Sequence, residues 1–205
     1  SEFKPIFMYE YLHRILGRII GIIFFIPLLY FTLKKAIPPV LIPRLYLLLI
    51  LGGFQGVLGW YMVKSGLVDD PNVSQYRLTA HLGMAVFIYS LILWTVFDLS
   101  LNYNHAIRSR IKWMSSTLTL LIFLMILSGG LVAGTRAGIP FPTWPLMGDT
   151  FIPPQIYSMN PSWLSAFEDM ATIQFNHRMF AYLLTIFIVI FAIVLLRSNV
   201  PRFLK

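Results

Sequence analysis

Histidine is the side chain in this sequence best placed to bind a metal, because the 205 residues include no cysteine. The absence of cysteine excludes thiolate sites and disulfides, so a metal would have to be held by His, Met or carboxylate. Four histidines are present, His13, His81, His105 and His177. These four are therefore the candidate ligands.

Two of the histidines stand in similar surroundings. The segment 10–14 (EYLHR) resembles the segment 174–178 (QFNHR), since both have an acid or amide, an aromatic residue, a gap and then His-Arg. Glu10 precedes His13 by three residues and shares its helical face, where a carboxylate could act as an acid, base or nucleophile. The alternative is a helix-start charge that the helix dipole stabilises. Gln174, at the matching position, has no ionisable group and could only bind a ligand.

The elements that position these residues are predicted to be membrane-spanning helices. Hydrophobic residues make up 58% of the chain and charged residues only 12%, which is more apolar than a soluble domain requires. Apolar runs of about 20 residues are long enough to cross a bilayer core. We place five spans at about 11–34, 44–64, 76–98, 112–134 and 174–197. The predicted fold is all-α and polytopic.

Basic residues predict the orientation of these helices. The formal charge of +8 comes from short clusters at helix ends, which is typical of membrane anchors and not of a nucleic-acid surface. The clusters lie on one side, predicted to be the inside: Lys34, Lys35 and Arg44; Arg108, Arg110 and Lys112; Arg197, Arg202 and Lys205. The segment with Asp69 and Asp70 and the long loop 135–173 are then outside.

This topology puts three histidines at one depth. His13, His81 and His177 fall in the first turns of their spans on the outer side, whereas His105 falls in an inner loop and is expected to be solvated. A small residue follows each of the three by one turn: Gly17, Ala85 and Ala181. Such a surface leaves room for a flat, bulky ligand, although ordinary packing of small residues between helices produces the same pattern.

Haem fits this arrangement better than zinc or copper. Zinc needs three or four ligands that converge on one point, whereas histidines on separate helices suit axial ligation of haem iron. Arginines near the same boundary could pair with haem propionates, and the candidates are Arg14, Arg77 and Arg178, with Arg18 and Arg136 nearby. Each of these arginines could instead be an interfacial anchor.

The repeated His-Arg segment also predicts the domain organisation. If the first and fifth spans are equivalent, the repeat period is four helices, and the intact protein has eight spans in two four-helix bundles. Residues 1–100 would supply three helices of the first bundle. Residues 101–205 would supply two helices of the second bundle. Because the chain starts without Met, we expect it to begin within a longer protein.

The whole chain resembles the haem A synthase family. The matching segments are 10–14 (ExxHR), 54–67 (FQGxLGWYMVKSGL), 74–83 (SQYRLxAHLG) and 175–178 (FxHR), with 129–138 and 145–148 similar to the outer loop of the family. The match is closest to the mitochondrial and α-proteobacterial branch, which lacks paired cysteines in that loop. The family has two pseudo-symmetric bundles of four helices, in agreement with the repeat.

The resemblance implies a membrane oxidoreductase that oxidises a methyl group of haem O to the formyl group of haem A, for cytochrome oxidase. It implies that His13 and His81 face haem O, that His177 is an axial ligand of haem b, and that Glu10 is catalytic. The implied location is the bacterial inner membrane, or the mitochondrial inner membrane in a eukaryote. Haem O synthase and oxidase assembly factors are the implied partners, and a homo-oligomer remains open.

Two other functions compete with this reading. One is a bis-histidine membrane cytochrome that transfers electrons and leaves haem unmodified, and the other is a carrier that delivers haem to an oxidase. The contrast between Glu10 and Gln174 favours an enzyme, because it gives one of the two sites an ionisable group.

Overall fold

The computed structural model describes residues 3–64, 73–101, 109–198 and 200, with side chains described from residue 8 onward. Five long helices account for most of these residues: α1 (Phe3–Leu33), α2 (Ile42–Lys64), α3 (Gln75–Ser100), α4 (Ser109–Thr135) and α6 (Met170–Leu196). Two short helical turns, η1 (Ser162–Leu164) and α5 (Ser165–Glu168), precede α6. The only β pairing in the described part of the chain is an isolated bridge between Met147 and Thr150. The predicted all-α fold is confirmed.

The five predicted spans are also confirmed. Each long helix contains a segment long and apolar enough to cross a membrane, beginning at residue 8 in α1 and at the first residue of each of the others. Two helices begin well before the predicted spans: α1 eight residues before the expected residue 11, and α6 four residues before the expected Gln174. Asp169 caps this helix, since its carboxylate accepts hydrogen bonds from the backbone N–H of Thr172 at 2.7 Å and from the hydroxyl of Thr172 at 2.6 Å.

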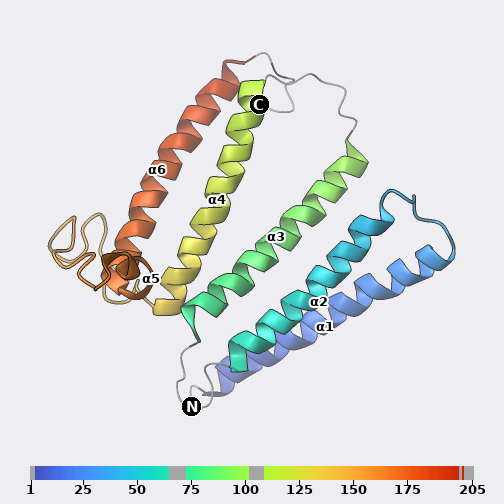
Figure 1. Cartoon of the computed structure of the whole chain (residues 1–205), viewed down its shortest axis with the longest axis horizontal. Coiled ribbons are helices and arrows are strands. Elements are labelled where there is room, and N and C mark those ends of the chain that lie inside the picture. The colour runs from blue at the N-terminus through green and yellow to red at the C-terminus, as the bar shows by residue number, and fades with distance from the viewer. Residues whose placement is uncertain (1–2, 65–72, 102–108, 199, 201–205) are drawn as a thin grey trace.

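The long helices lie side by side in the order α1, α2, α3, α4, α6, and each packs on its neighbours in that order (Figure 1). α1, α3 and α6 begin at one end of the molecule, where α2 and α4 finish (Figure 1). We call this end the histidine end, because His13, His81 and His177 all lie in the half of their helices that is nearer to it. The opposite end carries the connection between α1 and α2.

Large apolar side chains cover much of the outer surface of the helices. Trp94 and Trp113 are both about two-thirds exposed, and many isoleucines, leucines and phenylalanines of α1 and α6 are also exposed. Few apolar side chains are buried, among them Leu48, Met114 and Ile173. Helices that are apolar on all sides yet little buried need hydrocarbon around them, so the protein is a polytopic membrane protein.

α3 and α4 approach each other closely because two glycines of α4 face α3. A Cβ atom built on Gly134 would lie 2.5 Å from the Cα atom of Gln75. A Cβ atom built on Gly130 would lie 2.8 Å from the Oγ1 atom and 3.2 Å from the Cα atom of Thr79. Small residues four apart let two membrane helices bring their backbones together. This contact joins the first three spans to the last two.

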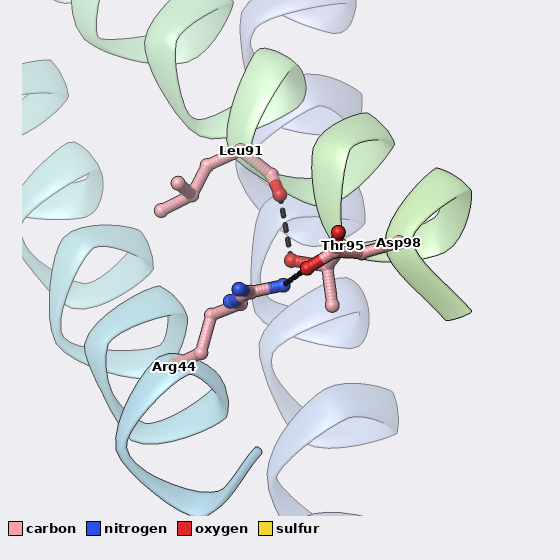
Figure 2. A network of polar contacts seen from close by, with 4 residues as sticks. All are labelled: Arg44, Leu91, Thr95 and Asp98. Carbon is pink, nitrogen blue, oxygen red and sulfur yellow. Dashed lines mark hydrogen bonds and ion pairs between the residues drawn. The ribbon is translucent and has the colours of Figure 1, made fainter. Parts of the chain in front are cut away.

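At the opposite end, an ion pair joins α2 to α3 (Figure 2). The guanidinium of Arg44 donates a hydrogen bond to the carboxylate of Asp98 at 2.8 Å. Thr95, one turn before Asp98, is buried, and its hydroxyl donates to the carbonyl of Leu91 at 2.8 Å. The hydroxyl of Thr95 therefore does not compete with Arg44 for Asp98. The pair connects the first turn of α2 to the last turn of α3.

Candidate functional site

The imidazole of His81 lies between α3 and α2 and is half-buried. The side-chain amide of Gln55 donates to the carbonyl of His81 at 3.0 Å, and its nitrogen lies 3.5 Å from Nε2 of the ring. Gly59, one turn along α2, faces the ring edge, and a Cβ atom there would lie 3.0 Å from Cε1 of His81. A side chain at position 59 would therefore push the ring out of place.

Two polar atoms in this region are buried without a hydrogen-bond partner among the described residues, Nδ1 of His81 and Oε1 of Gln55. A buried polar atom without a partner loses its hydration free energy and recovers nothing for it. Oγ1 of Thr79, Oε1 of Gln174 and the hydroxyl of Tyr182 are buried in the same way. The histidine end thus holds several polar groups for which the described residues supply no hydrogen bond.

His13 lies on α1, on the exposed surface of the helix, at the same end of the molecule and on the same side of α4 as His81. One turn from His13, Glu10 accepts a hydrogen bond from Arg14 at 3.2 Å, and both side chains are about half exposed. Apart from the backbone of its own helix turn, no atom of a described residue lies within 4 Å of a Cβ atom built on Gly17 or on Gly21, one turn further. The surface beyond His13 is thus open, as a flat ligand would require.

His177 is held by α4. Its Nδ1 atom lies 2.8 Å from the hydroxyl oxygen of Ser128, and a Cβ atom built on Gly129 would lie 3.5 Å from Cε1 of the ring, an ordinary contact distance. The ring is half-buried, and no hydrogen bond joins its Nε2 atom to a described residue. One ring nitrogen is therefore fixed by the protein, while the other is left for a ligand.

Two of the predicted arginines bind backbone carbonyls in this structure. Arg77 lies over the ring of Tyr61, 3.8 Å from its centroid, and donates to the carbonyl of Tyr61 at 3.1 Å. Arg178 donates to the carbonyls of Leu146 at 3.1 Å and Phe141 at 2.7 Å. A guanidinium has five N–H donors, so both retain donors for a further acceptor. Their observed contacts hold α3 to the end of α2, and α6 to the loop before it.

That loop, residues 136–169, is fixed to the histidine end at several points. The carboxylate of Glu168 in α5 accepts hydrogen bonds from the amide of Gln75 at 2.9 Å and from the hydroxyl of Tyr76. Tyr157 donates its backbone N–H to Thr172 at 3.1 Å and its hydroxyl to Asn176 at 3.0 Å. The loop is thus anchored to both α3 and α6.

An apolar groove of about 750 Å³ runs between α2, α3 and α4 below this loop. Phe54 and Leu58 line it from α2, and Phe167 closes it from α5. Ser128, which contacts His177, also lines the groove. The groove therefore reaches from the helix beside His81 to the residue that holds His177.

The structure brings His13 and His81 into one region and places His177 in another, on the far side of α4. His105 lies outside the described residues. Among the described side chains, no three of the types His, Asp and Glu converge as a metal centre would require. Sequence reasoning missed Gln55 and Ser128 as site residues. Gln55 lies inside a matching segment of the resemblance, whereas Ser128 had no signal other than its position beside two glycines.

These observations define the class of the protein. It is an α-helical membrane protein whose described residues form five spans, with three histidines at one end. Residues 1–204 match the family described as cytochrome oxidase assembly protein. The chain belongs to this family. No solved structure matches it.

Several relatives are named haem A synthase. The one from Nitrosospira multiformis is 50% identical over 196 residues, which are 93% of this chain and 55% of the relative. The one from Parvibaculum lavamentivorans is 46% identical over 189 residues, covering 92% of this chain and 55% of the relative. A third, from Wolbachia pipientis wMel, is 38% identical over 196 residues, covering 94% and 56%. The chain thus spans about half the length of these relatives.

Proposed function

We propose that the full-length protein is a haem A synthase, an oxidoreductase that converts the methyl group of haem O to the formyl group of haem A. The observation that carries this proposal is that relatives of this name align with 92–93% of the chain at 46–50% identity. The chemistry adds one water and removes four electrons and four protons, since R–CH₃ + H₂O becomes R–CHO + 4 H⁺ + 4 e⁻. The site therefore needs a group that accepts protons beside the substrate.

His13 and His81 hold the substrate haem in this proposal, and both serve as ligands of its iron. The open surface beyond His13 supports a ligand that is wide and flat. For Nε2 of His81 to reach iron, the amide of Gln55 must turn away from its position 3.5 Å from that atom. Gln55 would then have its amide free to bind the substrate.

Glu10 is the group that accepts protons. It stands one turn from His13 on α1, and Arg14 holds its carboxylate by an ion pair of 3.2 Å. A carboxylate in this position can take the proton of an attacking water, stabilise positive charge on the carbon, or add to that carbon for a time. Each role requires the carboxylate form of the side chain.

His177 holds haem b in the second bundle. The fit is supported by its ring, which α4 fixes at Nδ1 and supports at Cε1 while Nε2 is left without a hydrogen bond to a described residue. When bound, haem b supplies one-electron transfer between the substrate site and an acceptor. Arg14, Arg77 and Arg178 supply N–H donors near the histidines, and we assign them to the propionates of the two haems.

The proposed location is the bacterial inner membrane, with the histidine end on its outer side. The haem O synthase that makes the substrate and the assembly factors of cytochrome oxidase are the proposed partners. Lipid surrounds the apolar faces of the helices. Self-association into a homo-oligomer belongs to the same proposal.

Substitution of Glu10 by Gln in the full-length protein tests the catalytic assignment. Glu10→Gln keeps the size of the side chain and removes its charge, so haem b content should stay normal while haem A formation falls by a factor of roughly 10² to 10⁴. His177→Ala should instead lose haem b, because an axial ligand is gone. Haem extraction and pigment analysis of the membranes measures both quantities.

Asp149→Asn is the matched control, because it removes an exposed carboxylate from the outer loop without touching α1. This variant should make haem A at the normal rate. Normal haem A production by Glu10→Gln would exclude a catalytic carboxylate at this position. Normal haem b content in His177→Ala would exclude His177 as its ligand.

A further inference from the structure

The hydroxyl of Ser128 in α4 makes two close contacts at once. Its oxygen lies 2.8 Å from the carbonyl oxygen of Met125, three residues earlier in the same helix. The same oxygen lies 2.8 Å from Nδ1 of His177 in α6. Both distances are those of ordinary hydrogen bonds.

The direction of these two bonds follows from the number of hydrogens. A carbonyl oxygen can only accept, so the single hydroxyl hydrogen of Ser128 is donated to Met125. If this hydrogen pointed to His177 instead, two oxygen atoms 2.8 Å apart would face each other with lone pairs alone. Ser128 therefore accepts a hydrogen bond from Nδ1 of His177, so Nδ1 must carry a hydrogen.

We infer that Ser128 is a positioning residue that sets the tautomer of His177. A neutral imidazole has one N–H, so a hydrogen on Nδ1 leaves Nε2 with a free lone pair. This is the form that can bind iron. The inference deepens the proposed function, on which it rests, by naming the partner of the haem b ligand on a neighbouring helix.

Gly129 supports the same arrangement from the adjacent position of α4. The 3.5 Å contact expected between a Cβ atom there and Cε1 shows that the backbone of α4 lies close against the ring. Ser128 thus fixes the edge of the imidazole at Nδ1, while α4 limits its rotation. Ligand histidines in proteins commonly donate their second N–H in this way, and losing the acceptor typically lowers metal affinity by about 10- to 100-fold.

The tautomer can be measured without haem. In the full-length protein labelled with ¹⁵N-histidine and prepared free of haem, NMR distinguishes a protonated ring nitrogen from an unprotonated one, and the His177→Ala variant assigns the signal. We expect Nδ1 of His177 to be protonated and Nε2 unprotonated. A spectrum with the hydrogen on Nε2 would overturn the inference, whatever the protein does with haem.

The second measurement is haem b binding by variants of α4. Ser128→Ala should lower haem b affinity by about 10- to 100-fold and shift its midpoint potential, whereas Ser128→Thr, which keeps the hydroxyl, should restore both. Thr119→Val is the matched control, because Thr119 is exposed and its hydroxyl donates to the carbonyl of Ser115 on the same helix, with no hydrogen bond to another described helix. It should bind haem b like the unmodified protein.

The outcomes separate this inference from the proposed function. Unchanged affinity and potential in Ser128→Ala would overturn the role of Ser128 while leaving His177 as a ligand. Retention of haem b by His177→Ala would overturn the ligand assignment and, with it, the positioning role. The tautomer measured in the haem-free protein would still show whether Nδ1 of His177 donates the hydrogen bond to Ser128.

Discussion

Replacement of Gly134 by Ala should weaken the contact between α3 and α4 more than any other single glycine substitution in the described helices. The new Cβ atom would lie 2.5 Å from Cα and 2.6 Å from Cβ of Gln75. An ordinary contact needs at least 3.4 Å, so the helices must separate by about 0.9 Å (3.4 minus 2.5). Because the obstructing atoms belong to backbone and Cβ, no side-chain rotation can relieve the clash.

Overpacking of this kind costs about 1 to 3 kcal/mol. With 1.4 kcal/mol for each factor of ten, the ratio of folded to unfolded protein should fall by roughly 5- to 150-fold. Gly83→Ala should lose less stability. Its Cβ would lie 2.6 Å from Leu127, but the atom it meets is the flexible end of a side chain. Gly53→Ala should lose no stability, since no atom of another described helix lies within 4 Å of the added Cβ.

Equilibrium unfolding of the full-length protein in mixed detergent micelles, followed by far-UV circular dichroism, measures these differences. The loss of stability should be largest for Gly134→Ala, smaller for Gly83→Ala and absent for Gly53→Ala. Equal unfolding curves for the first and the last of these variants would refute the close approach of α3 and α4.

Three further predictions concern other parts of the molecule. Gly59→Ala should displace the ring of His81, since its Cβ would lie 3.0 Å from Cε1, and lower haem A formation while leaving haem b content normal, as pigment analysis will show. Asp169→Ala removes the cap of α6 and should lower the free energy of unfolding by about 0.5 to 2 kcal/mol in the micelle assay. In right-side-out vesicles, an impermeant thiol reagent should label a single cysteine at Ile139 and spare one at Lys34. The reverse labelling pattern would invert the predicted orientation.

The spans could be predicted from the sequence because length and hydropathy alone determine them, and the shared end of His13, His81 and His177 follows from the order of the spans. The predicted start of α6 lies four residues after the observed one, because the apolar pattern gives less information there than the cap formed by Asp169. This cap is visible only as a hydrogen bond into the first turn.

Contacts between distant segments could not be predicted from the sequence. Ser128 and His177 are 49 residues apart, and only the relative register of α4 and α6 brings them together. The same holds for Arg178, whose pattern predicts a cation near the boundary but not the loop carbonyls that it binds. Helix periodicity gives the face of a residue, whereas the partner on another helix depends on how the two helices pack.

Pigment analysis decides whether the full-length protein modifies haem O, as we propose. The full-length protein should be expressed in cells that make haem O but have no haem A synthase of their own, and the haems of their membranes extracted and separated. Haem A should appear as haem O declines. Membranes that gain haem b while haem O stays unchanged, with no haem A, would refute the proposed function and identify an electron-transfer cytochrome.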